Sequence, residues 1–336
     1  MNYSLRDFLV SRFGAGGGFE MAMDSPEAFF DWRTAMISEM GRITGFAKMP
    51  RQDYLATEIE SVNFQKFVRK KIVLQTGAQI FMPVYVLMPK GKGEKPPIIA
   101  IPGHGSNGKE GVCGAFKINR HYNHDYAIAL ARAGFAVFCP DLAGMGERRE
   151  AREADNPAKS SCTDLNLAAI ALGISLQAVH LHDLRALVDY IFDCDNIDKD
   201  KLAAIGFSGG GWQTLWAAAM DERIKTACIC GYVHGFGESI LGRHACGCNF
   251  IPGLWEGWDI ADLARMIAPR RLYIETGERD PLNGPSGLAN VLPQIAAIRQ
   301  TYSLFDPTNL IHHIFPGGHE FSGNAIKFLT KLPKGG

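Results

Sequence analysis

The chain has 336 residues, in which 35 Lys and Arg side chains are balanced by 35 Asp and Glu side chains. The zero formal net charge and a pI near 7.1 remove the basic excess that would favour nucleic acid or an anionic membrane as a partner. Hydrophobic residues at 46% and charged residues at 21% are typical of a folded globular chain rather than a disordered one.

The sequence gives three indications of cellular location. It contains no stretch of about 18 apolar residues, so we expect no transmembrane helix. The N-terminus carries Asp7 and lacks a basic start followed by an apolar run, so no signal peptide is visible. Of the eight cysteines, Cys139, Cys228 and Cys230 lie inside apolar runs, which is typical of buried free thiols. Together these features predict a cytoplasmic protein.

Residues 1–60 are predicted to form a helical extension packed on a larger body. Ser25 is suited to a helix N-cap and Pro26 to the first helical position. Apolar residues then recur with helical period over 29–40, and Gly41 is the expected end of the helix.

Residues 61–336 read as one α/β domain, because strand-like and helix-like segments alternate. This alternation predicts a mostly parallel twisted sheet with helices on both faces. The irregular stretch at 232–262 follows a strand end, where insertions often cover active sites. Strands are predicted at 64–74, 79–88, 98–101, 135–139, 202–206, 226–230, 271–276 and 310–315, and helices at 124–133, 165–192, 210–220, 287–302 and 324–332.

The strongest motif is Gly206-Phe207-Ser208-Gly209-Gly210, which matches the pattern G-x-S-x-G. It lies between an apolar strand-like segment at 202–205 and a helix-like segment at 212–217, the context that a nucleophile elbow requires. The serine of an elbow occupies a strained turn, so the residues two before and two after it must be small. The alternative is an ordinary strand-to-helix turn capped by Ser208.

A serine hydroxyl attacks well only when a base takes its proton and a carboxylate orients that base. In folds with this elbow, the acid and then the histidine follow the serine along the chain. His319 is the favoured base because its loop follows the last predicted strand, at the end of the sheet where Ser208 also lies. Asp280 is the favoured carboxylate and Glu278 is its rival; Asp280 as a simple turn residue before Pro281 is the alternative.

Acyl transfer also needs N–H donors for an oxyanion, and the residue after the nucleophile, Gly209, supplies one. The loop after the first parallel strand, residues 102–108, supplies the other. His104 in this loop is expected to shape it rather than to transfer protons.

Taken together, these motifs resemble the α/β-hydrolase superfamily, and more narrowly its bacterial dienelactone-hydrolase-like and acetyl-xylan-esterase-like serine hydrolases. The resemblance implies an α/β-hydrolase fold, Ser208 as nucleophile, Asp280 as acid and His319 as base. It also implies oxyanion N–H groups from Gly209 and Ser106. The segments that carry it are 102–105, 141–148, 206–211, 268–270, 277–280 and 317–319.

Two weaker patterns bear on metal and substrate binding. Cys228-x-Cys230 and Cys246-x-Cys248 could supply four thiolates to zinc, but their spacing is tighter than usual, so we expect no metal and no cofactor. The substrate-pocket candidates are aromatic residues in or near the irregular stretch, with His104 beside them. They wall a pocket for the substrate or simply pack the loop, and the sequence leaves both open. These candidates are His104, Trp212, Phe236 and Trp255.

The predicted function is a serine hydrolase that cleaves a carboxylic ester, acetyl or another short acyl ester included, through an acyl-enzyme. Its partner is a small-molecule ester, with no nucleic acid and no membrane, and a homo-oligomer stays open. One alternative is a peptidase related to prolyl oligopeptidases. The other is a catalytically silent binding protein with the same fold.

Overall fold

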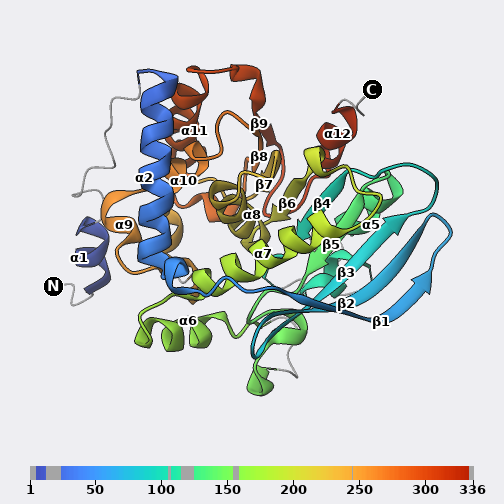
Figure 1. Cartoon of the computed structure of the whole chain (residues 1–336). Helices are drawn as coiled ribbons and strands as arrows, with labels where there is room; N and C mark the ends of the chain where they lie inside the picture. Colours follow the sequence, from blue (N-terminus) through green and yellow to red (C-terminus); the bar gives the residue numbers. More distant parts are fainter. Residues whose placement is uncertain are drawn as a thin grey trace.

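The computed structural model describes residues 5–12, 24–104, 107–114, 125–153, 159–243 and 245–332. Within these ranges nine strands form one sheet in the order β1-β2-β3-β5-β4-β6-β7-β8-β9, with helices on both faces (Figure 1). The strands are β1 (Leu55–Asn63), β2 (Phe67–Gly77), β3 (Ile80–Pro89), β4 (Pro97–Ile101), β5 (Ala136–Pro140), β6 (Ala203–Phe207), β7 (Thr226–Cys230), β8 (Arg271–Gly277) and β9 (Leu310–Phe315).

The six strands from β5 to β9 in sheet order all pair in parallel. Every residue of β4, β5, β6 and β7 is buried, as expected for strands that are covered on both faces and written as continuous apolar runs. The strands β1, β2 and β3 pair antiparallel and join the parallel part through β3 and β5. The predicted mostly parallel sheet is therefore confirmed.

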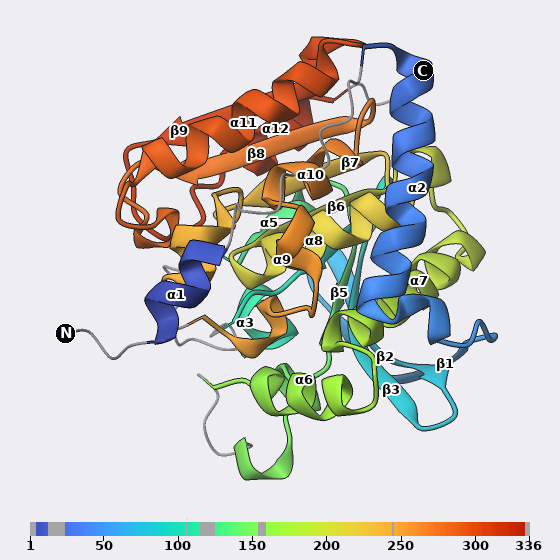
Figure 2. The same ribbon diagram turned by 90° about the vertical axis from the view of Figure 1, so that its left-hand side faces the viewer.

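Helices cover the two faces of the sheet unequally, as the two views together show (Figure 1 and Figure 2). Side chains of α2, α7, α8, α10 and α11 form the larger hydrophobic cluster on one face, and those of α3, α5 and α12 contribute to the cluster on the other. The helices are α1 (Leu5–Arg12), α2 (Pro26–Thr44), α3 (Lys109–Val112), α5 (Tyr126–Arg132), α6 (Cys162–Ala171), α7 (Leu176–Asp193), α8 (Gly209–Met220), α9 (Leu254–Gly257), α10 (Ile260–Arg265), α11 (Leu288–Tyr302) and α12 (Asn324–Lys331).

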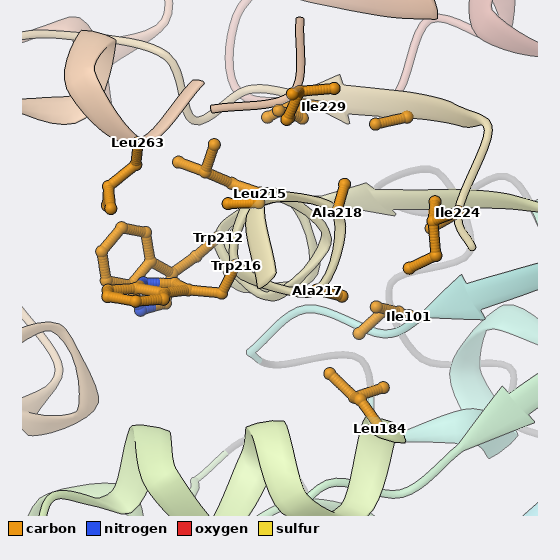
Figure 3. Close-up of a cluster of buried hydrophobic side chains, with 14 of the residues drawn as sticks. Ile101, Leu184, Trp212, Leu215, Trp216, Ala217, Ala218, Ile224, Ile229 and Leu263 are labelled. Carbon is orange, nitrogen blue, oxygen red and sulfur yellow. The ribbon is translucent and has the colours of Figure 1, made fainter. Parts of the chain in front are cut away.

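Helix α8, which begins directly after Ser208, lies in the middle of the larger cluster. Trp212, Leu215 and Trp216 project from it towards Leu263 of α10 and other buried side chains, and all four are fully buried (Figure 3). Every residue of α8 except Met220 is buried, so the helix is surrounded by protein on nearly all sides. The nucleophile therefore stands at the end of a firmly packed element.

Helix α2 begins where the sequence predicts but ends later than predicted. The Ser25 side chain accepts a hydrogen bond from the backbone N–H of Ala28 at 3.2 Å, and Pro26 is the first helical residue. The helix passes Gly41 and ends at Gly45, whose φ of 81° is the left-handed conformation common at helix ends. Phe29 and Trp32 of this helix are fully buried in the larger cluster.

Two predicted boundaries differ from the structure. The sheet already starts at Leu55, so the division at residue 60 falls inside β1. Most residues of β1 are exposed, and an edge strand of this kind lacks the apolar signal that marks buried strands. The helix predicted over 165–192 is two helices, α6 and α7, because Gly173, with a φ of 74°, lies in the turn between them.

Among the described residues, no single helix has the length and apolar composition needed to cross a membrane; α6 and α7 meet that test only as a pair, bent by 103°.

Candidate active site

The residues around Ser208 form a tight strand–turn–helix connection between β6 and α8. Ser208 has φ 57° and ψ −124°, a conformation that side-chain-bearing residues rarely adopt. A Cβ atom on Gly206 would overlap the backbone of Gly210, and one on Gly210 would overlap the carbonyl oxygen of Ile101. The glycines of the motif are therefore required by close approach of the strand, the helix and β4, as the elbow interpretation predicts.

Three side chains from distant parts of the sequence meet at this turn. The Nε2 atom of His319 lies 2.8 Å from Oγ of Ser208, and its Nδ1 atom lies 2.7 Å from Oδ2 of Asp280. They meet because β6, β8 and β9 are parallel, and each residue lies in the connection after the carboxyl end of its strand. This is the hydrogen-bonded order of a Ser-His-Asp triad.

Asp280, and not Glu278, is the carboxylate that reaches His319. Asp280 is buried, and its Oδ1 atom accepts a hydrogen bond of 2.8 Å from the backbone N–H of Leu282, which leaves Oδ2 for the imidazole. Glu278 is exposed. The sequence favoured Asp280, and the geometry agrees with that choice.

Of the two predicted oxyanion donors, Gly209 is described by the structure and Ser106 is not. Gly209 is the first residue of α8, so its backbone N–H is among those that have no acceptor within the helix. It directly follows Ser208, where an oxyanion donor is needed. Ser106 lies outside the described residues, so its predicted role stays a prediction.

The two ring nitrogens of His104 lie near different neighbours. A Cβ atom on Gly209 would overlap its Nδ1 atom, so that side of the ring lies against the elbow. Its Nε2 atom lies 3.3 Å from Sγ of Cys248. The side chain thus contacts the turn beside the nucleophile on one side and a group of thiols on the other.

Among the described residues, His104 and these thiols form a group that could hold a metal ion. One ligand atom from each of His104, Cys162, Cys246 and Cys248 lies within 4.8 Å of all the others. The four-thiolate site considered from the sequence is not formed, because Cys228 and Cys230 are buried in β7 and belong to the opposite hydrophobic cluster. Sequence reasoning missed Cys162, since nothing in its spacing links it to residues some 85 positions further on.

Two of the predicted pocket residues are packing residues in this structure. Trp212 and Phe236 have no exposed surface. Trp255 stacks on both rings and, unlike them, is partly exposed. The aromatic cluster therefore stiffens the irregular stretch beside α8, which was the second of the two alternatives.

His234 is a further residue at the site that the sequence did not single out. It is buried, its ring packs on Tyr232, and neither ring nitrogen has a hydrogen-bond partner among the described residues. Burial lowers its pKa to about 4, although the charge of nearby Asp280 acts in the opposite direction. His234 is therefore a neutral imidazole close to the acid of the triad at physiological pH.

A buried ion-pair network supports the loop that carries His104. Lys109, at the start of α3, donates to Asp141 at 2.8 Å and also to Glu147. The backbone N–H of Lys109 donates to the same Asp141 carboxylate at 2.7 Å. Buried charges of this kind are tolerated only when fully paired. The network fixes the end of the loop against the connection that follows β5, which contains the 141–148 motif.

Comparison with known proteins agrees with this architecture. The sequence model of a family described as "alpha/beta hydrolase fold" matches residues 96–242. "Putative hydrolase YtaP" of Bacillus subtilis is 24% identical over 262 residues, which cover 74% of this chain and 83% of that protein.

Solved structures of esterases are similar in fold. A protein from Bacteroides fragilis named "putative acetyl xylan esterase" has a TM-score of 0.77 and 17% identity, over 94% of this chain and 83% of that one. A glucuronoyl esterase from Solibacter usitatus has a TM-score of 0.61 and 14% identity, over 91% of this chain and 93% of that one. The chain accordingly has the α/β-hydrolase fold, and this fold is similar to that of solved acetyl xylan esterase structures.

Proposed function

We propose that the protein is a serine hydrolase that cleaves carboxylic esters through an acyl-enzyme. The observation that carries the proposal is the continuous hydrogen-bonded chain from Ser208 through His319 to Asp280, with distances of 2.8 and 2.7 Å. A chain of this geometry at a strained elbow lets an otherwise weak nucleophile lose its proton as it attacks.

Each residue has a defined role in the proposed reaction. Oγ of Ser208 attacks the ester carbonyl while Nε2 of His319 takes its proton, and Oδ2 of Asp280 accepts the Nδ1–H bond that fixes the imidazole tautomer. The N–H of Gly209 donates to the oxyanion of the tetrahedral intermediate, and one such donor supplies about 3 kcal/mol of barrier lowering. His319 then protonates the leaving alcohol, and a water molecule hydrolyses the acyl-enzyme by the same steps in reverse.

The substrate class that we propose is a small-molecule ester with an acetyl or another short acyl group. Support for an acetyl group comes from the names of similar solved structures, which include acetyl xylan esterases. The name of another, a glucuronoyl esterase, supports ester cleavage but not a short acyl group.

The test combines an active-site probe with a substrate panel. A fluorophosphonate should label Ser208 and abolish hydrolysis of p-nitrophenyl acetate, and Ser208→Ala should be neither labelled nor active. Ser303→Ala, which removes an exposed serine hydroxyl, is the matched control and should be labelled and active like the unaltered protein.

Two other results would contradict the proposal. Preferred cleavage of aminoacyl amides over esters would favour a peptidase related to prolyl oligopeptidases. Failure of the folded protein to react with the probe and with every ester in the panel would favour a catalytically silent binding protein.

A further inference from the structure

A closed set of four metal-ligand side chains lies beside the proposed active site. One ring nitrogen of His104 and the Sγ atoms of Cys162, Cys246 and Cys248 all lie within 4.8 Å of one another. Nε2 of His104 lies 3.3 Å from Sγ of Cys248. Around a tetrahedral zinc ion with Zn–S bonds of 2.3 Å, two sulfur ligands lie about 3.8 Å apart. Small side-chain rotations are therefore enough to close the group around one ion.

The chemistry of the donors favours zinc over other metals. Three thiolates and one imidazole are a recurrent structural zinc set, with four protein ligands and no open position. Soft thiolate ligands do not suit magnesium or calcium, which prefer oxygen. Cys162 and Cys248 are buried, whereas His104 and Cys246 are partly exposed, so an ion could enter from the side of these two residues.

The backbone around the cysteines is already arranged to bring the thiols together. A single turn of 3-10 helix, Gly247–Asn249, has Cys246 as its N-cap and includes Cys248. Both cysteines therefore contribute to the group despite the short C-x-C spacing. A Cβ on Gly247 would lie 2.7 Å from Cα of Thr163 in α6, so only glycine allows this approach. Hydrogen bonds from Gly247 N to Thr163 Oγ1 at 3.0 Å, and from Asn166 Nδ2 to Gly247 O at 2.8 Å, hold the turn on α6.

Polar groups surround all three sulfur atoms, and most of them suit a thiolate; the exception is the carbonyl oxygen of Ala143, 4.0 Å from Sγ of Cys162, to which a thiol donates. Cys162 is the first residue of α6, where the helix N-terminus stabilises negative charge. The hydroxyl groups of Ser160 and Thr163 lie 3.8 and 4.0 Å from Sγ of Cys246. The side-chain amide of Asn249 donates to Sγ of Cys248 at 3.8 Å. Outer contacts of this kind orient and tune metal ligands.

We propose that His104 Nε2 and the thiolates of Cys162, Cys246 and Cys248 bind one structural zinc ion. This inference reverses the expectation of a metal-free protein that the C-x-C spacing gave. That expectation paired Cys246 and Cys248 only with Cys228 and Cys230, whereas the tertiary structure supplies His104 and Cys162 instead.

The ion would also position the proposed catalytic elbow. This positioning role, unlike the zinc site itself, rests on the proposed function. The zinc-binding side of the His104 ring is Nε2, and its Nδ1 side lies against Gly209. Fixing His104 therefore fixes the loop 102–104 against the residue whose N–H is the proposed oxyanion donor. His104 is a positioning residue in this scheme, acting through Gly209.

Metal analysis of the full-length chain, purified under reducing conditions without chelators, is the first test. The expected content is roughly one zinc ion per chain. Cys162→Ser and Cys248→Ser should lower zinc occupancy by about tenfold or more. Cys194→Ser, which alters a partly exposed thiol outside the group, is the matched control and should keep its zinc.

A second measurement does not depend on the folding of any variant. The unaltered chain produced in zinc-depleted, cobalt-supplemented medium should show the visible absorption and thiolate-to-metal charge-transfer bands of tetrahedral Co²⁺. Absence of both zinc and cobalt, iron as the bound metal, or a disulfide among these cysteines under the same reducing conditions would each overturn the proposal.

The positioning role has its own readout. Removing the ion from protein that stays folded should lower kcat for a short-acyl ester with little change in KM, and zinc should restore kcat. Unchanged kcat in metal-free protein would overturn the positioning role alone. Zinc binding together with an unreactive Ser208 would instead overturn the proposed function and leave the metal site standing.

Discussion

The imidazole of His104 lies so close to the α carbon of Gly209 that a single methyl group at Gly209 would overlap Nδ1. One residue follows β4 and the other begins α8, and they meet because β4 and β6 are parallel neighbours in the sheet. The contact joins the proposed metal site to the proposed oxyanion donor. It also makes Gly209 the most direct point at which to test that connection.

We predict that Gly209→Ala lowers kcat for a short-acyl ester by about 10² to 10³-fold, the usual effect of losing an oxyanion donor. The new methyl group must displace either the His104 ring or the start of α8. Steady-state kinetics and thermal unfolding check this, and Gly257→Ala is the control because its Cβ would meet nothing within 4 Å. Equal activity of the two variants would contradict the role of this contact.

Asp280→Asn should lose about 10⁴-fold in kcat while it stays folded, because an amide favours the wrong tautomer of His319. Glu278→Gln should lose far less, since Glu278 is exposed and Asp280 makes the 2.7 Å contact. The comparison uses initial rates with the same ester and circular dichroism. A crippled Glu278→Gln beside a nearly normal Asp280→Asn would reverse the assignment.

The buried imidazole of His234 predicts a loss of stability in mild acid. Its pKa is about 4 in the folded protein against an ordinary value of 6.5, so between these values the unfolded chain binds the proton that the folded chain does not. The stabilising contribution is complete above pH 6.5 and is lost as the pH falls towards 4. At pH 5 the loss from this one group is about 2 kcal/mol.

Urea unfolding at pH 7.5 and pH 5 checks this prediction. His234→Leu has no titrating group at this position, so the difference in its unfolding free energy between the two pH values should be smaller by about 2 kcal/mol. The comparison between pH values separates the protonation effect from any change in packing. An identical pH dependence in both proteins would show that His234 is protonated in the folded state.

Helix α2, which contains Phe29 and Phe30, should contribute to the stability of the whole chain. Phe29 is fully buried among the core residues, and Phe30, its neighbour, is 44% exposed. Phe29→Ala should lower the free energy of unfolding by about 3 to 5 kcal/mol, since it removes a large buried ring. Phe30→Ala is the matched control and should cost much less, although its ring contacts Phe29 and Phe305. Equal effects would mean that the helix is not an integral part of the core.

Much of the architecture is readable from local patterns. Buried strands such as β4 and β6 are short apolar runs, and the helix start at Ser25-Pro26 follows from capping chemistry. The exposed edge strand β1 gave no such pattern. The break between α6 and α7 was missed because Gly173 lies within an otherwise helical run.

The sequence by itself determined the elbow at Ser208, since only glycines at 206 and 210 allow so close a turn, and it indicated His319 and Asp280 through their place after predicted strands. The sequence favoured Asp280 over Glu278, and the tertiary structure has Asp280 in contact with the imidazole. Only the tertiary structure decided that Trp212 and Phe236 pack the core. It alone also brought Cys162 to His104, Cys246 and Cys248. The physical reason is that a turn is fixed by steric limits within a few residues. A cluster drawn from three separate segments depends instead on how helices and loops pack, which no local spacing encodes.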